Sequence, residues 1–121
     1  MRYKELIVWQ KSHALSLKTF NAVKSIKPSC AGDVIIKQLL RSVTSIGANI
    51  AEGYGRFEGK EFTRFLRIAY GSSIETDNWL TMLSDSYLIS SEAASELIKN
   101  NEEILKMLTT MIKKIKENNN G

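Results

Sequence analysis

Basic residues recur at helical spacing in the middle of this chain. Lys60, Arg64 and Arg67 stand at positions i, i+4 and i+7, which places their side chains on one face of a helix. Arg56 precedes them in a glycine-rich turn, beside the aromatic residue Tyr54. The planar guanidinium group of arginine donates paired hydrogen bonds to phosphate, and an aromatic ring can stack on an unpaired base. The pattern therefore predicts a surface that binds a nucleic acid.

The same cations have acidic neighbours, so a second interpretation stays open. Glu52, Glu58 and Glu61 are close enough in sequence to form ion pairs with them, and a neighbouring subunit could supply further carboxylates. The basic residues would then stabilise the fold or an assembly instead of binding phosphate. Under the first interpretation, the candidate nucleic-acid-binding residues are Arg56, Lys60, Arg64 and Arg67, with Lys11 and Lys18 on an earlier helix as additions.

Polar residues interrupt the apolar pattern of the central helices. Asn49, Glu52 and Glu75 fall near positions that face the core. In an antiparallel helical hairpin Glu75 would lie near Arg41, and a buried carboxylate needs such a partner. We interpret these four residues as a structural polar network that fixes helix register or a subunit interface. The alternative is a catalytic acid near Glu52 and Glu75.

Residue types that carry catalysis or bind metals are scarce in this chain. It has one histidine, His13, and one cysteine, Cys30, on different segments. A metal site needs several converging ligands, and the sequence contains neither the Glu-x-x-His pairs of di-iron bundles nor a phosphate-binding G-x-x-x-x-G-K loop. We therefore predict no catalytic residue, no metal site, no cofactor and no enzymatic activity.

Length and charge bound the class of protein. The 121 residues predict one domain covering residues 1–121, and a single cysteine without a long apolar run predicts a cytoplasmic protein with no membrane partner. Residues 1–67 carry twelve Lys and Arg against five Asp and Glu, whereas residues 68–121 carry five against eight. One basic and one acidic surface would attract a polyanion and allow copies of the chain to associate.

Apolar residues at three- and four-residue steps predict four helices, over residues 5–25, 33–53, 60–86 and 91–117. We expect Asp33 to cap the second helix, Gly53 and Gly55 to end it, and residues 118–121 to be disordered. Joined by short loops, such helices predict an all-α, up-down-up-down antiparallel four-helix bundle.

Each helix should present one apolar stripe to the core. In the first helix the expected stripe contains Leu6, Trp9, His13, Leu17, Phe20 and Lys24, flanked by Ala14, Leu15 and Val23. In the third helix it includes Leu66, Ala69, Ile74 and Leu80. Small residues such as Ser42, Ser45 and Gly47 in the second helix predict a close approach by a neighbouring helix.

Three segments carry a resemblance to a known family. Residues 6–12, 45–56 and 60–72, together with Glu75, are similar to the signature of bacterial four-helix-bundle proteins encoded by intervening sequences within 23S ribosomal RNA genes. The chain departs from that pattern at Gly47, where the family commonly has proline. It departs again at Leu40-Arg41, where the family often has two basic residues in a row.

The resemblance implies a four-helix bundle that assembles as a ring-shaped homopentamer. The family is similar to the accessory proteins of diversity-generating retroelements, which are basic pentamers that bind nucleic acid and a reverse transcriptase. Our leading hypothesis is a non-enzymatic, cytoplasmic homo-oligomer that binds RNA or DNA. The alternative is a protein–protein scaffold whose basic face contacts neighbouring subunits or an acidic partner protein.

Overall fold

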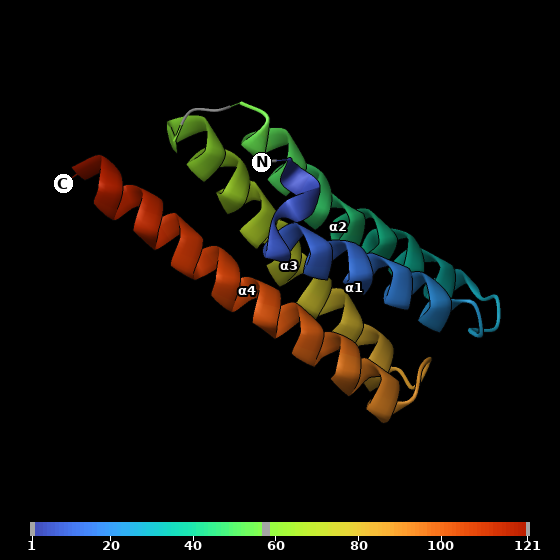
Figure 1. Cartoon of the computed structure of the whole chain (residues 1–121). Coiled ribbons are helices and arrows are strands. Elements are labelled where there is room, and N and C mark those ends of the chain that lie inside the picture. The colour runs from blue at the N-terminus through green and yellow to red at the C-terminus, as the bar shows by residue number, and fades with distance from the viewer. Residues whose placement is uncertain (1, 57–58, 121) are drawn as a thin grey trace.

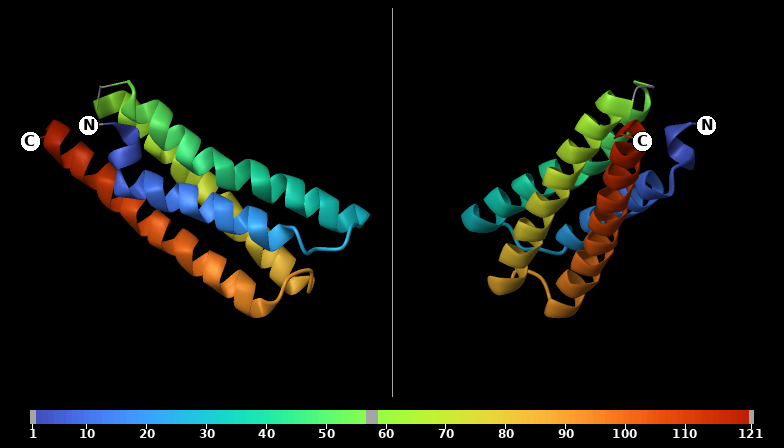
Figure 2. Two further views of the ribbon diagram at one scale, coloured as in Figure 1. Left: turned by 45° about the vertical axis from the view of Figure 1, so that its right-hand side comes forward. Right: turned by 90° about the vertical axis from the view of Figure 1, so that its left-hand side faces the viewer.

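Four long helices build the protein (Figure 1), in a computed structural model that describes residues 2–56 and 59–120. After the short 3-10 turn η1 (Tyr3–Glu5), the helices are α1 (Ile7–Val23), α2 (Cys30–Tyr54), α3 (Gly59–Asp85) and α4 (Ser91–Asn120). Each helix runs antiparallel to the one before it, and both chain ends lie at the same end of the bundle as the α2–α3 connection (Figure 2). The predicted all-α four-helix fold is confirmed.

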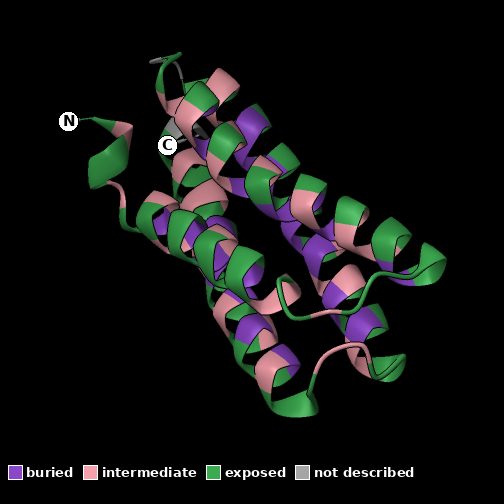
Figure 3. Cartoon of the chain, turned by 90° about the vertical axis from the view of Figure 1, so that its right-hand side faces the viewer, coloured by how far each residue is buried: buried purple, intermediate pink, exposed green. Residues whose placement is uncertain are grey.

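The core lies between two pairs of helices. α2 packs against α1 and α3, and α4 packs against α3 and α1, while the Cα atoms of the diagonal pairs stay more than 8 Å apart within the described ranges. Buried positions face inward along all four helices (Figure 3). The fully buried aliphatic side chains include Leu15 of α1, Leu39, Val43, Ile46 and Ile50 of α2, Leu66 and Leu80 of α3, and Ile104 and Leu108 of α4.

Hydroxyl side chains begin two of the helices. Ser29 is the N-cap of α2, because its Oγ accepts a hydrogen bond from the Gly32 amide at 3.0 Å. The prediction that Asp33 caps this helix is wrong: Asp33 lies inside the first turn, where a carboxylate still favours the helix dipole. Ser90 Oγ likewise accepts a hydrogen bond from the Ala93 amide at 3.1 Å at the start of α4.

Two helix ends differ from the prediction. α2 ends at Tyr54 with Gly55 as its C-cap, so Gly55 is where a stop residue was expected, whereas Gly53 lies buried inside the helix. α4 continues to Asn120, so the expected disorder of residues 118–120 is wrong, and Gly121 lies outside the described residues. Asparagine lowers helix propensity only slightly, and the preceding turns of α4 pack on the core through Met111, Ile112 and Ile115.

The face that α1 turns to the core differs from the expected stripe. Val8, Ser12, Leu15 and Thr19 are buried, whereas Leu17 is 53% exposed and His13 lies outside, stacked on Trp9 at 4.8 Å between ring centroids. Ser12 and Thr19 can be buried because each hydroxyl donates to the carbonyl oxygen four residues earlier, at 2.7 and 2.8 Å. The burial of satisfied hydroxyls leaves larger apolar side chains on the surface.

On α3, too, hydroxyl side chains are buried while a larger apolar side chain is left on the surface. Ser73 and Thr76 are buried, and Ile74, expected in the core, is 48% exposed. Ser73 Oγ donates to Asn101 Oδ1 at 2.6 Å, and Asn101 Nδ2 returns a hydrogen bond to the Ser73 carbonyl oxygen at 2.8 Å. This reciprocal pair satisfies the buried Asn101 amide and fixes the register of α4 against α3.

None of the helices in the described ranges has the length and apolarity needed to cross a membrane.

Candidate nucleic-acid interface

Two arginines converge on one aromatic ring at the end of the bundle where α2 gives way to α3. The Arg56 and Arg64 guanidinium carbons lie 5.4 and 4.7 Å from the centroid of the Phe65 ring. Phe65 is only 8% exposed, so its ring is a fixed platform for both cations. We call these three residues the arginine–phenylalanine cluster. It brings together one residue from the turn after α2 and two from the start of α3.

Close packing of α2 on α3 holds this platform in place. Gly53 is buried against Phe65: a Cβ atom on Gly53 would lie 2.5 Å from the Phe65 Cβ. One residue further, the Tyr54 ring meets the Phe62 ring edge-on, with centroids 5.6 Å apart. The position of the Phe65 ring therefore depends on a residue without a side chain at position 53.

Each arginine of the cluster also has a carboxylate neighbour. Arg56 NH2 lies 2.8 Å from Glu52 Oε1, and Arg64 Nε lies 3.2 Å from Glu61 Oε2. All four side chains are substantially exposed, and exposed pairs of this kind contribute about 0–1 kcal/mol. Two of the basic residues therefore form the ion pairs of the second interpretation. These pairs do not prevent phosphate from binding, because a phosphate oxygen can replace a weakly held carboxylate.

A second group of cations lines a groove between α3 and α4. The groove has a volume of about 390 Å³ and is lined by Arg67, Tyr70, Thr109, Ile112, Lys113 and Lys116. Among the described residues, no carboxylate lies within ion-pair distance of the three cations of the groove or of Lys60. We call these six lining residues the α3–α4 groove.

The antiparallel arrangement explains why these lysines meet Arg67. The start of α3 lies beside the end of α4, so lysines about 50 residues away in sequence join the basic residues of α3. The end of α4 extends past the start of α1, which leaves this part of the α3–α4 seam uncovered (Figure 2). Arg56, Lys60, Arg64 and Arg67, which the sequence singled out, thus share one end of the bundle with Lys113 and Lys116.

Lys11 and Lys18 occupy a different surface, between α1 and α4. Lys11 Nζ lies 2.6 Å from Glu103 Oε1, and Lys18 Nζ lies 3.8 Å from Glu96 Oε1 and 3.3 Å from Asn100 Oδ1. These exposed contacts join α1 to α4, on a surface separate from the arginine–phenylalanine cluster and the α3–α4 groove. Their placement supports a role in closing the bundle, and the interface proposed below leaves them out.

The Lys11 pair has an electrostatic consequence. The hydrogen bond from the Lys11 ammonium and its charge lower the pKa of the Glu103 carboxyl below its ordinary value. Because the pKa is lower in the folded state, the pair stabilises the fold at pH values above the ordinary carboxyl pKa. This contribution disappears as the pH falls through the lowered pKa.

Replacing Lys11 with methionine should raise the pKa of Glu103 toward its ordinary value, because the donor and the positive charge are both removed. An NMR titration of the glutamate side-chain carboxyl groups measures this shift. Lys18→Met is the matched control, since Lys18 contacts Glu96 instead, and it should leave Glu103 unchanged. A Glu103 titration curve that does not move in Lys11→Met would contradict the contact.

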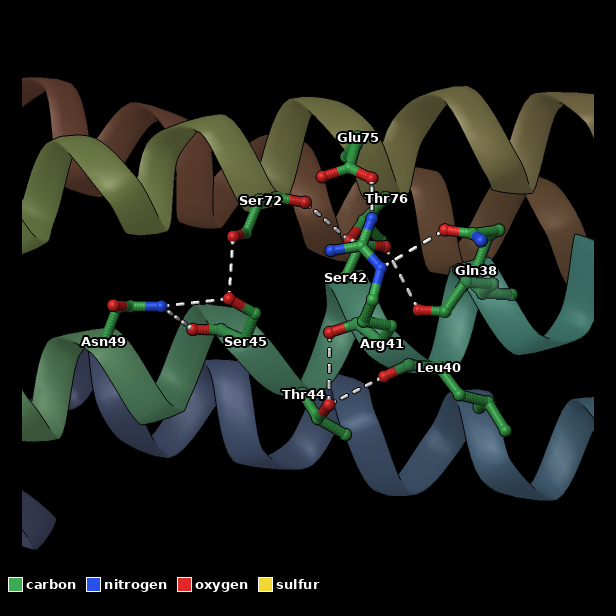
Figure 4. A network of polar contacts seen from close by, with 11 residues as sticks. Gln38, Leu40, Arg41, Ser42, Thr44, Ser45, Asn49, Ser72, Glu75 and Thr76 are labelled. Atoms are coloured by element: carbon green, nitrogen blue, oxygen red, sulfur yellow. Dashed lines mark hydrogen bonds and ion pairs between the residues drawn. The ribbon is translucent and has the colours of Figure 1, made fainter.

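The predicted polar network is only partly assembled (Figure 4). Arg41 pairs with Glu75 across the α2–α3 seam, and Asn49 Nδ2 donates to the Ser45 carbonyl oxygen and Oγ at 2.8 and 2.9 Å. Glu52 lies elsewhere, on Arg56. The expected near-core position of the charged members is wrong, because Arg41, Glu75 and Glu52 are 41–57% exposed at their side chains.

The buried part of the seam is made by hydroxyl groups. The Thr76 and Ser42 hydroxyl oxygens lie 3.0 Å apart, and the Ser45 and Ser72 hydroxyl oxygens lie 2.9 Å apart (Figure 4). Small side chains at these positions allow α2 and α3 to approach closely, as the sequence predicted. The seam has the properties of a structural contact: each of these buried groups has a partner.

Sequence reasoning missed two components of the basic end. Neither Phe65 nor Tyr70 was connected to the basic residues of α3. The place of the α4 lysines follows from topology, because in an antiparallel pair of helices the last turns of one lie beside the first turns of the other. Nothing in the spacing indicates that Phe65 would support two arginines. Among the described residues, no three His, Cys, Asp or Glu side chains converge as metal ligands would.

We call the end of the bundle that carries the arginine–phenylalanine cluster and the α3–α4 groove the cationic end. The fold and this end together define the chain as a four-helix-bundle protein with a cationic end. The chain belongs to the 23S rRNA-intervening sequence protein family, which matches residues 4–110, and this confirms the resemblance seen in the sequence. A solved structure from Bacteroides thetaiotaomicron VPI-5482, a protein of unknown function from the S23 ribosomal protein family, is similar with a TM-score of 0.80 and 32% identity. The match covers 88% of this chain and 99% of that one. No curated protein matches the chain.

Proposed function

We propose that this protein is a non-enzymatic RNA-binding protein, and that RNA phosphates bind the cationic end of the bundle. One observation carries the proposal: the arginine–phenylalanine cluster and the α3–α4 groove put Arg56, Arg64, Arg67, Lys113 and Lys116 at one end of the molecule. Among the described residues, only Glu52 and Glu61 lie within ion-pair distance of them. The family's link to 23S rRNA favours RNA over DNA as the ligand.

Binding of this kind should depend steeply on salt. Each neutralised phosphate releases counterions, so four phosphate contacts predict a slope of about −3 in log affinity against log salt concentration. Fluorescence anisotropy with structured ribosomal RNA, across a range of salt concentrations, measures the slope. Light scattering on the same samples reports the size of the protein.

Polyglutamate serves as the control polyanion in the same titration. Submicromolar binding to RNA with weak binding to polyglutamate supports the proposal, because polyglutamate offers charge without phosphate or bases. Equal binding to both polymers, or no RNA binding near physiological salt, would contradict it.

A second proposed function is self-assembly, which a specific observation favours. Leu17 on α1 and Ile74 and Met82 on α3 are each about half exposed, on helix faces away from the cationic end. Ile74 and Met82 stand eight residues apart on neighbouring positions of one α3 face, and a row of exposed apolar side chains on one helix face favours contacts between copies of the chain. We propose a homo-oligomer on this basis, and the resemblance described above points to a pentamer. A mass measurement in solution tests it, and a monomer at micromolar concentration would contradict it.

A further inference from the structure

The α3–α4 groove combines features that a purely electrostatic surface would not need. Tyr70 is 38% exposed at the groove, one turn after Arg67 on α3. Ile112 of α4 is half-buried and packs on the core, so it gives the groove an apolar floor. Lys113 and Lys116 stand one turn apart on the opposite wall. The lining of the groove thus combines an aromatic residue, an apolar residue and three cations.

This arrangement matches the two chemistries of a single nucleotide. A base is flat and stacks on an aromatic side chain, whereas its flanking phosphates need cations. The volume of about 390 Å³ lies within the range of small-ligand sites. Arg67 follows Arg64 by one helical turn, so a strand lying on the arginine–phenylalanine cluster can continue into the groove.

A duplex cannot use such a groove, because its bases are paired and stacked on one another. An unpaired base can leave the stack and insert beside an aromatic ring. We propose that the α3–α4 groove binds one unpaired nucleotide of single-stranded RNA. Its base stacks on Tyr70 against Ile112, and the adjacent phosphates bind Arg67, Lys113 and Lys116. This inference rests on the RNA-binding function proposed above and names the form of RNA that the site prefers.

The test compares a short unstructured RNA with a duplex RNA of equal length, by anisotropy at one salt concentration. Tyr70→Ala should weaken single-strand binding about 5- to 150-fold and leave duplex binding within about twofold. Tyr70→Phe keeps the ring and should bind like the original protein. Tyr87→Ala is the control, since Tyr87 is 91% exposed in the α3–α4 connection at the other end of the bundle and should have no effect.

Photocrosslinking of the unaltered protein gives a readout that does not depend on a variant. Single-stranded RNA carrying 5-bromouridine should crosslink to the peptide that contains Tyr70, as identified by mass spectrometry. Crosslinks only elsewhere would overturn the inference, and so would equal losses of single-strand and duplex binding in Tyr70→Ala.

Failure of this inference can be told apart from failure of the proposed function. If Tyr70→Ala binds single strands normally while binding by the unaltered protein stays steeply salt-dependent, the groove inference fails and RNA binding stands. If the unaltered protein binds neither RNA, both fail.

Discussion

Replacing Gly53 with valine should lower the free energy of unfolding by about 3 kcal/mol, the upper part of the range for overpacking a tight contact. Even a single Cβ at this position would lie 2.5 Å from the Phe65 Cβ and 3.2 Å from the Phe62 ring. Neither atom is the end of a flexible side chain, so α2 and α3 must separate. For a domain of this size the loss corresponds to a fall of about 10 °C in Tm, which circular dichroism can measure.

Gly71→Val is the matched control for this prediction. Gly71 is also in a helix, but no atom outside its own helical surroundings lies within 4 Å of the Cβ position. Valine should be tolerated there, and its better helix propensity should leave Tm unchanged or slightly raised. Equal melting temperatures for the two variants would show that the α2–α3 contact is looser than described here.

The Gly53 substitution should also disturb the geometry of the candidate nucleic-acid interface. Moving Phe65 displaces the ring on which Arg56 and Arg64 lie, so RNA affinity should fall even at temperatures where the variant is folded. The close packing at Gly53 therefore connects the stability of the fold with the geometry of the cationic end.

The four helices could be predicted because their apolar period and their connections are local signals. Leu39, Val43, Ile46 and Ile50 repeat at helical spacing, and all four are buried as that spacing implies. The expected disorder of residues 118–120 was wrong because α4, which packs on the core as far as Ile115, continues through them, and such packing is not visible in the local sequence.

The rotation of α1 and α3 about their axes was harder to predict, for a physical reason. A pattern of apolar residues assumes that hydroxyls face water, but Ser12, Thr19 and Thr76 satisfy their hydroxyls within their own helices. Once satisfied, these small side chains fit where neighbouring helices approach closely. Leu17 and Ile74 are then left outside, which no local pattern reveals.

The candidate site likewise has one part that the local sequence predicts and one part that depends on packing between helices. The face made by Lys60, Arg64 and Arg67 follows from helical spacing alone. The ion pairs of Lys11 and Lys18 depend on α4 lying beside α1, because that arrangement brings Glu103 and Glu96 next to them. Which lysines form ion pairs is therefore decided by packing between helices that are far apart in the sequence, and the local pattern does not show it.

Reversing two charges at the cationic end should reduce RNA affinity on the order of 100-fold or more. In Arg64→Glu/Arg67→Glu, two charge-assisted contacts of about 1.5–3 kcal/mol each are lost, and repulsion of phosphate is added. The slope of log affinity against log salt concentration should become shallower by about two. Anisotropy titrations with the RNA described above measure both quantities, while circular dichroism should show an intact helical fold, since both side chains are exposed.

The control for this variant carries the same change in net charge elsewhere. Lys27 and Lys37 are exposed toward the opposite end of the bundle and have no carboxylate within ion-pair distance among the described residues. Lys27→Glu/Lys37→Glu should therefore weaken binding only slightly, through the long-range field. Equal losses in the two double variants would mean that overall charge attracts RNA and that the cationic end is not a site.

Light scattering on the charge-reversed protein separates the two proposed roles of these arginines. If they bind phosphate, the variant keeps the mass of the unaltered protein and loses RNA. If they bind acidic residues of a neighbouring copy, the assembly dissociates, because each reversed charge then faces a carboxylate. The exposed pairs with Glu52 and Glu61 make the first result the expected one: they partly neutralise Arg56 and Arg64 within one chain, while Arg67 opens onto a groove between helices of that same chain.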